Sequence, residues 1–128
     1  MYAARRVIII SGYLDFTDRT ARDEVLAAGA SLQRATREGE PGCSAYCFSA
    51  DPVIDTRVRV FELWDDRASL ATHFEHPNYH EMRAVFHRFP RTGGEVKKYR
   101  CDLSEPVYDE SGTLRADFFT APGSAPPA

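Results

Sequence analysis

Hydrophobic and polar positions along the first third of the chain predict a strand followed by a helix. Residues 6–15 are rich in β-branched and aromatic side chains, which is typical of a strand. Thr17-Asp18 then offers a helix cap, and apolar residues recur at helical spacing beyond it. The Pro41-Gly42 pair ends this pattern and turns the chain. We therefore predict an amphipathic helix over about 19–37, with its apolar side at Val25, Ala28 or Gly29, Leu32 and Ala35.

The rest of the pattern predicts three more strands and an interrupted helical region. Residues 43–50 and 56–64 are the next two strands, separated by a turn at Asp51-Pro52. A short helix is predicted to begin at Asp65-Asp66, and Pro77 interrupts it. The last two elements are a helix over about 78–89 and a strand over about 95–103.

The order β-α-β-β-α-β predicts an α+β fold of the ferredoxin-like kind, with an antiparallel sheet that has helices on one face only. The open face would then alternate toward polar residues if it met water. It does not, because residues 7–10 are apolar on both faces, and Phe61 and Leu63 lie opposite Val60 and Trp64. A second copy of the sheet is the simplest cover, so we predict a homodimer with its sheets packed face to face.

The chain divides into a domain over residues 1–103 and a C-terminal segment over residues 104–128. Residues 104–119 are too apolar for a free tail, so we expect them to dock as an arm on their own subunit or on the partner. Residues 120–128, rich in Pro and Ala, are expected to be flexible.

The composition is that of a soluble globular protein, with 43% hydrophobic and 27% charged residues among 128. A net charge of −3 and scattered basic residues argue against a nucleic-acid partner. No stretch approaches the ~20 apolar residues of a membrane span. The three cysteines lack CxxC spacing, and Cys43 and Cys47 would lie about 13 Å apart on one strand, too far for a disulfide. A reducing cytoplasmic location is therefore expected.

Two short motifs stand at the ends of predicted strands. Glu-Pro-Gly-Cys-Ser-Ala-Tyr, residues 40–46, leads into the second strand, and Glu-Leu-Trp-Asp, residues 62–65, ends the third. His73 follows nine residues after Trp64. In this order and spacing the motifs resemble the antibiotic biosynthesis monooxygenase family, over about residues 6–103.

The resemblance implies a dimeric α/β-barrel with a pocket between sheet and helices. Better-known members are quinol or anthrone oxygenases that need neither metal nor flavin, while others degrade haem, act on small signalling molecules or have no known reaction. The haem-degrading branch is identified by an Asn on strand one and by a Trp and a His on the second helical region. Residues 7–14 contain no Asn, and His73 and Arg83 stand about where that Trp and His would be. These departures argue against haem degradation.

His73 is the first candidate for chemistry. Without a cofactor the substrate must supply the electrons, and deprotonation makes a phenol or quinol electron-rich enough to react with oxygen. Histidine suits this task because its pKa lies near neutrality. The resemblance therefore favours His73 as a general base, and a packed or surface histidine without a role is the alternative.

Further residues are candidates for the substrate pocket: Trp64, Phe74, Tyr79, His80 and Phe86. Trp64 could stack on a substrate ring or belong to the core. Tyr79 and His80 could bond a substrate oxygen or face solvent. Glu62 is expected in a structural or dimer-contact role, bonded to backbone or to an Arg if buried. Tyr46 is expected in the core, at the dimer surface or in the pocket wall.

Metal and cofactor binding find no support in the sequence. His76 and His80 have the i, i+4 spacing that can hold zinc in a helix. Pro77 disfavours a helical conformation at His76, and no third ligand is evident. No GxGxxG, P-loop or GxSxG motif occurs, so we expect neither metal nor cofactor.

These observations predict a cofactor-independent monooxygenase that uses molecular oxygen and a small aromatic substrate, a quinol or a polyketide-like phenol. Two alternatives stay open. One is a proton-transfer enzyme, isomerase-like, in the same pocket. The other is a non-catalytic dimeric module that binds a small ligand. Oxygen dependence separates the first two, and loss of turnover on removal of His73 separates both from the third.

Overall fold

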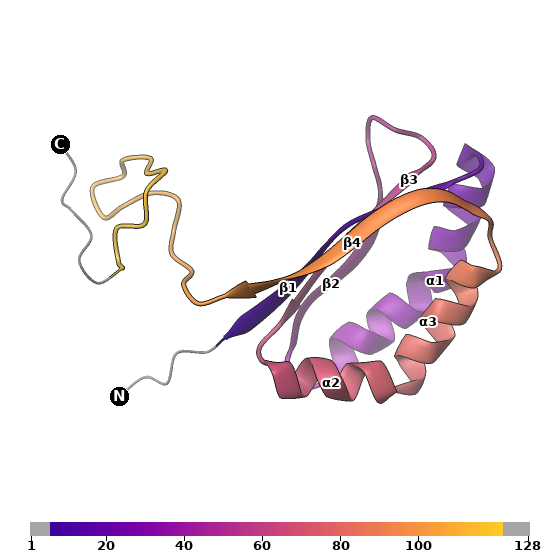
Figure 1. Cartoon of the computed structure of the whole chain (residues 1–128), viewed down its shortest axis with the longest axis horizontal. Coiled ribbons are helices and arrows are strands. Elements are labelled where there is room, and N and C mark those ends of the chain that lie inside the picture. Colours follow the sequence, from indigo (N-terminus) through magenta and orange to yellow (C-terminus); the bar gives the residue numbers. More distant parts are fainter. Residues whose placement is uncertain (1–5, 122–128) are drawn as a thin grey trace.

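The computed structural model describes residues 6–121. A four-stranded sheet forms one layer and three helices form the other (Figure 1). The elements follow in the order β1 (Val7–Phe16), α1 (Arg19–Gly39), β2 (Cys43–Ala50), β3 (Arg57–Trp64), α2 (Arg67–Glu75), α3 (Pro77–His87) and β4 (Arg91–Cys101). The predicted ferredoxin-like α+β fold is thus confirmed.

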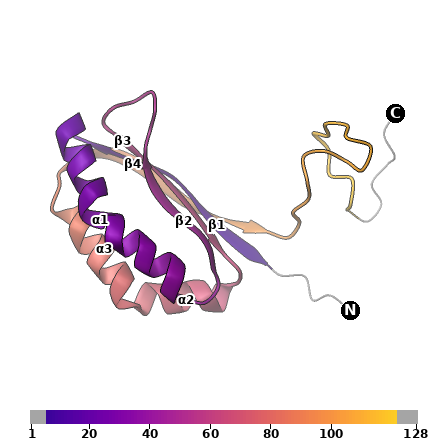
Figure 2. The same ribbon diagram turned by 180° about the vertical axis from the view of Figure 1, so that it is seen from behind.

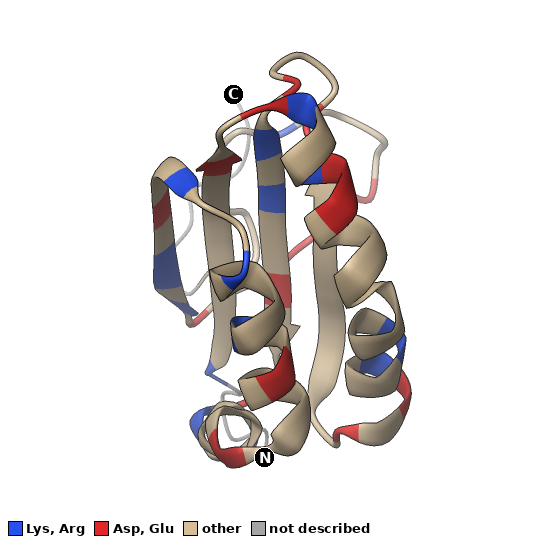
Figure 3. Ribbon diagram, turned by 90° about the vertical axis from the view of Figure 1, so that its right-hand side faces the viewer, with Lys and Arg blue, Asp and Glu red and all other residues tan. Residues whose placement is uncertain are grey.

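The sheet is antiparallel throughout, with strand order β2-β3-β1-β4. β1 and β3 are the central strands, and their alternation decides which side chains meet the helices. Ile10 and Phe16 of β1 and Val58, Val60 and Trp64 of β3 are buried on the helix side. Figure 3 looks onto this helical layer, with the strands behind it.

Local sequence signals explain the helix boundaries. The Asp18 carboxylate accepts from the Ala21 backbone N–H at 2.8 Å and caps α1, and Asp66 caps α2 through the Ser69 N–H in the same way. Pro77 occupies the first turn of α3, where its missing N–H costs nothing. His76 is extended, with ψ at 143°, as the following proline requires. The interruption predicted at Pro77 is therefore a clean break between two helices.

Two details of the sequence-based prediction were wrong: the start of the last strand and part of the apolar side of the first helix. The last strand begins at Arg91 instead of 95, because β4 pairs along the whole of β1 and shifts register only after Asp15. Residues 91–94 contain two glycines, which are depleted in strands, and Thr92 is their single β-branched residue, so their pattern gave no strand signal. In α1, Gly29 is buried and Ala28 exposed, which decides between the two alternatives predicted there. Thr36 is buried in place of the predicted Ala35.

The open face of the sheet has an apolar half and a charged half. Phe61 and Tyr99 are 43% and 50% exposed, and the half-buried Ile9 and Leu63 lie on the same face by strand alternation. At the other end, Arg57 forms two hydrogen bonds to the Asp15 carboxylate, at 2.8 and 3.0 Å, and its guanidinium lies 3.8 Å from the Tyr13 ring centre. The apolar half is the part that lacks cover within one subunit.

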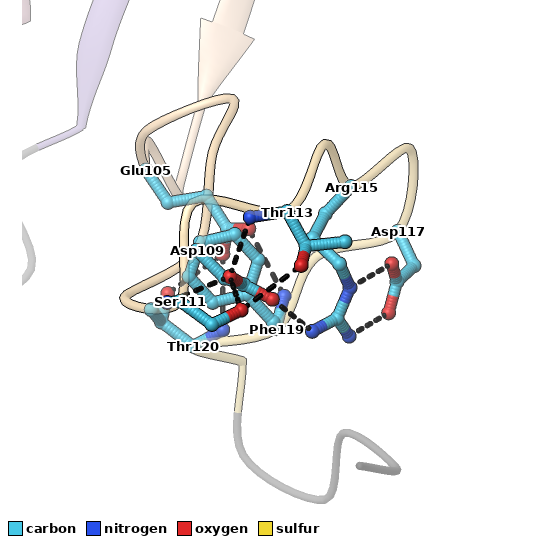
Figure 4. A network of polar contacts seen from close by, with 8 residues as sticks. All are labelled: Glu105, Asp109, Ser111, Thr113, Arg115, Asp117, Phe119 and Thr120. Carbon is cyan, nitrogen blue, oxygen red and sulfur yellow. Dashed lines mark hydrogen bonds and ion pairs between the residues drawn. The ribbon is translucent and has the colours of Figure 1, made fainter. Parts of the chain in front are cut away.

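Residues 104–121, the C-terminal arm, stand away from the sheet and helices in both views of the ribbon (Figures 1 and 2). Arg115 organises the arm by bonding the carboxylates of Asp109 and Asp117, and Glu105 accepts from the backbone N–H groups of Phe119 and Thr120 (Figure 4). The arm is therefore braced by its own polar contacts. Most of the predicted flexible end, residues 122–128, lies outside the described residues.

None of the helices in residues 6–121 is long and apolar enough to cross a membrane.

Candidate active site

A pocket of about 700 Å³ lies between the sheet and helices α2 and α3. All four strands contribute to its wall, and β4 closes one side with Arg91, Gly93, Gly94 and Val96. Its apolar lining is largely aromatic, from Tyr46, Phe48, Phe74, Tyr79 and Phe86. A planar ring can stack on such a surface, so the pocket suits a small aromatic molecule.

His73 lines this pocket from the last turn of α2 and is only 1% exposed. Its Nδ1 lies 2.8 Å from Oε1 of the buried Glu40. An ionised carboxylate can only accept a hydrogen bond, so the pair places the proton of a neutral imidazole on Nδ1. Within residues 6–121, Thr36 supplies the one buried side-chain polar atom without a partner. His73 Nε2 also has no hydrogen-bond partner among those residues, but it is not one of the fully buried atoms. It is therefore accessible from the pocket.

Glu40 is held in place by contacts with α1 and α3. It is the C-cap of α1, and its backbone N–H bonds the Thr36 carbonyl. Its second carboxylate oxygen accepts from Asn78 Nδ2 of α3 at 3.1 Å. His76 Nδ1 lies 3.9 Å from that oxygen but already accepts from the Asn78 backbone N–H. Glu40 therefore acts as an orienting group for His73, fixed by Asn78.

Aromatic rings surround the His73 imidazole. Trp64 is tilted against it, with ring centres 4.4 Å apart and an angle of 32° between the planes. Tyr46 and Tyr79 present their edges, at 5.5 and 5.4 Å. Burial among these rings lowers the pKa of His73, and the Glu40 hydrogen bond opposes that effect. The imidazole is therefore neutral near pH 7, and its free Nε2 can accept a proton from a bound molecule.

Glu62 is a second titratable group in the pocket wall. It is 7% exposed, and burial raises its pKa to about 7, although the Trp64 indole N–H donates to its Oε1 at 3.0 Å. A carboxyl with this pKa exchanges its proton near neutrality. The site therefore contains two groups, His73 and Glu62, that can move protons.

The predicted pocket residues divide into two groups. Phe74, Tyr79 and Phe86 line the pocket together with His73. Trp64 and His80 do not: Trp64 is fully buried behind the His73 ring, and His80 is exposed on α3.

The two residues that we expected in structural roles both reach the pocket. Tyr46 is 2% exposed and belongs to both the core and the pocket wall. Glu62 faces the helices and so lies away from the open face of the sheet, where the dimer contact is predicted. Its bonded partner is the Trp64 indole, neither a backbone group nor an Arg.

Sequence reasoning missed the role of Glu40 and the basic residues Arg83, His87 and Arg91, which also line the pocket. Glu40 stands in the first motif, but a glutamate before Pro-Gly is also typical of the end of a helix, so the motif did not indicate a role in the site. The i, i+4 spacing of Tyr79, Arg83 and His87 was a usable signal, since it places them on one helix face.

Within residues 6–121, no group of three or more His, Cys, Asp or Glu side chains is arranged to hold a metal.

Comparison with known proteins supports the fold and identifies the family. Residues 8–85 match the family model described as antibiotic biosynthesis monooxygenase. An uncharacterized Synechocystis protein, sll1783, is 37% identical over 79 residues, which cover 62% of this chain. The match spans about half of that relative, 53% of its length.

Two solved structures share the architecture. A Caulobacter crescentus protein, described as a candidate antibiotic biosynthesis monooxygenase, superposes with a TM-score of 0.68 at 17% identity, covering 80% of this chain and 93% of that one. A Deinococcus radiodurans protein with the same description gives 0.68 at 20% identity, covering 78% and 97%.

The molecule is thus a ferredoxin-like α+β protein with a histidine–carboxylate pair inside an aromatic pocket. The chain belongs to the antibiotic biosynthesis monooxygenase family, because the family model covers more than half of its length.

Proposed function

We propose that this protein is a cofactor-independent monooxygenase of small aromatic compounds, a quinol or a polyketide-like phenol, with His73 as the general base. The observation that carries the proposal is the His73–Glu40 pair in an aromatic pocket, with Nδ1 engaged and Nε2 free. Family membership supports the oxygenase reaction class.

The chemistry follows from the position of the proton. His73 Nε2 removes the phenolic proton, and the electron-rich anion transfers one electron to molecular oxygen. The radical pair then combines at a ring carbon. Loss of water leaves a quinone, so that one oxygen atom enters the ring and the other leaves as water. The substrate supplies all four electrons, and Glu40 stabilises the imidazolium that forms meanwhile.

A proton-transfer enzyme, isomerase-like, is the second candidate, and Glu62 is the observation that favours it. A base and a carboxyl with a pKa of about 7 in one pocket can remove a proton from one atom of a substrate and return it to another. Such a reaction needs no oxygen.

We also propose that the working unit is a homodimer in which the open faces of two sheets meet. Phe61 and Tyr99 on that face are exposed in the single subunit. Covering these side chains removes apolar surface from water, which favours association.

Oxygen uptake by the purified protein tests the proposed reaction. A panel of quinols and phenols would be measured against the autoxidation rate of each compound, with wild type, His73→Ala and Glu40→Gln. We expect uptake above background that falls about a hundredfold or more in His73→Ala, the usual contribution of a positioned base. Glu40→Gln keeps the shape but removes the charge, so a smaller loss is expected.

His80→Ala is the matched control, because it removes an exposed histidine outside the pocket. Its rate should equal that of wild type. Uptake no faster than autoxidation would remove the oxygenase proposal, and solvent deuterium exchange into the same compounds without oxygen would then favour proton transfer.

A further inference from the structure

The pocket has a basic end that the proposed oxygenase reaction does not use. Arg83 and His87 of α3 and Arg91 at the start of β4 all line it. Two consecutive elements, joined by residues 88–90, thus place basic side chains along one cavity. Lys and Arg segments on α3 and β4 are coloured blue in Figure 3.

The two guanidinium groups have no anionic partner. Among residues 6–121, the ion pairs involve other residues, and neither the Arg83 nor the Arg91 side chain forms a hydrogen bond or an ion pair. Among the described residues that line the pocket, Glu62 has the single carboxyl group, and it is buried beside Trp64. The basic end is therefore open to an anion from outside.

The basic side chains of α3 lie on the same helix face as Tyr79, which is next to His73. Tyr79, Arg83 and His87 are spaced by four residues along α3, so they share one face. Tyr79 contacts the His73 ring, with centres 5.4 Å apart. A helix rises 1.5 Å per residue, which places Arg83 about 6 Å and His87 about 12 Å along the axis from Tyr79. The pocket thus runs from a proton-accepting end to a cationic end over roughly the length of one substituted ring.

Resting on the proposed function, we infer that the natural substrate is an aromatic compound bearing an anionic group, a carboxylate or a phosphate, which Arg83 and Arg91 bind while the ring lies beside His73. Guanidinium groups bind both oxyanions with paired hydrogen bonds. The arrangement also sets orientation, because the anion fixes which ring atom faces Nε2. A neutral quinol would lack this anchor.

A competing explanation is that basic residues at the end of α3 only balance the helix dipole. Arg88 distinguishes the two, since it sits at the same helix end as the C-cap but does not line the pocket. Arg88→Gln therefore removes the same charge as Arg83→Gln without touching the proposed anion site.

Calorimetric binding of matched ligands tests the inference without requiring turnover. The probes are 4-hydroxyphenylacetate, its neutral amide and phenyl phosphate, titrated into the full chain and into Arg83→Gln, Arg91→Gln and Arg88→Gln. We expect the carboxylate to bind roughly tenfold or more tighter than the amide, and Arg83→Gln and Arg91→Gln to abolish that difference. Added salt should weaken the anion and leave the amide unchanged. The phosphate arm decides between the two oxyanions.

Equal affinity for acid and amide would overturn the inference, as would an equal loss in Arg88→Gln or no binding of any probe. Failure of the oxygenase proposal looks different. Tight, arginine-dependent binding of the anion without oxygen uptake would leave the anion site standing and remove only the reaction. Oxygen uptake that is as fast with neutral phenols as with their acids would leave the reaction standing and remove the anion site.

Discussion

At the scale of single residues, the site depends on burying groups that normally carry charge. Glu62 and Glu40 lie within the same aromatic surroundings as His73, and each bonds a ring N–H. Burial lowers the pKa of His73, so its imidazole is neutral near pH 7, and it raises the pKa of Glu62 to about 7, so this carboxyl populates both its protonated and its ionised form there. Proton transfer is then possible in either direction at little cost.

The raised pKa of Glu62 makes stability depend on pH. Between its ordinary value of 4.5 and about 7, the folded state binds more protons than the unfolded state, so this contribution to the free energy of unfolding falls as pH rises. Glu62→Gln removes the dependence and can still accept from the Trp64 indole. Relative to wild type, the variant should gain on the order of 3 kcal/mol between pH 4.5 and 8.

Urea unfolding of both proteins across that range measures the difference. Glu75→Gln is the control, because it removes an exposed carboxylate of α2. Its stability should depend on pH in the same way as that of wild type. His73 contributes with the opposite sign, because its lowered pKa makes stability rise with pH below 6.5, and this effect is present in both proteins. Parallel profiles for wild type and Glu62→Gln would contradict the assignment of a raised pKa.

At the scale of elements, the β1–β4 pair builds the wall of the pocket. Gly12 of β1 pairs with Val96, and the two backbones approach so closely that a Cβ on Gly12 would meet the Glu95 carbonyl oxygen at 1.9 Å. A rigid backbone atom cannot move aside as a side chain would. The absence of a side chain at Gly12 therefore lets β4 pack against β1.

Gly12→Ala should push β4 from β1, with a loss of about 2–3 kcal/mol in the free energy of unfolding. Ligand binding should weaken as well, because Gly94 and Val96 line the pocket. Gly93→Ala is the control on the facing strand, since its Cβ would meet nothing within 4 Å. Denaturant unfolding compares the two, and equal stability of both variants would contradict the close approach.

At the scale of the whole molecule, one subunit leaves an apolar surface uncovered and an arm apart from its body. Phe61 lies on the apolar half of the open face, opposite the helices. The arm is braced by its own ion pairs, of which Arg115 with Asp109 and Asp117 is the centre (Figure 4). Both features would be explained by a second copy of the chain.

Phe61→Lys should convert the proposed dimer into a monomer without unfolding the subunit, because Phe61 is 43% exposed and contributes little to the core. Sedimentation or light scattering at several protein concentrations measures the mass. Val53→Lys, at a loop position that is 87% exposed, should stay dimeric. A wild-type protein of monomer mass, or a Phe61→Lys variant of unchanged mass, would exclude this interface.

Much of the fold could be predicted from local pattern. The caps at Asp18 and Asp66, the break at Pro77 and the alternation of β3 all act within a few residues, so their signals are present in the sequence. The early part of β4 could not be predicted, because Arg91–Gly94 becomes a strand only by pairing with the end of β1. Gly29 is buried in place of Ala28 because Met82 of α3 packs against it.

The candidate site could be predicted only in part, for the same reason. His73 was identifiable from its place after the second motif, and the aromatic residues of α2 and α3 from their helical spacing. The sequence itself thus determined the order of elements, the family motifs and the residue types that can do proton chemistry. Tertiary structure alone brought Glu40 to His73 across 33 positions, placed Glu62 in the pocket and made Arg91 line the same pocket as Arg83. These contacts join elements whose approach depends on how the sheet and helices pack, and no local pattern encodes that approach.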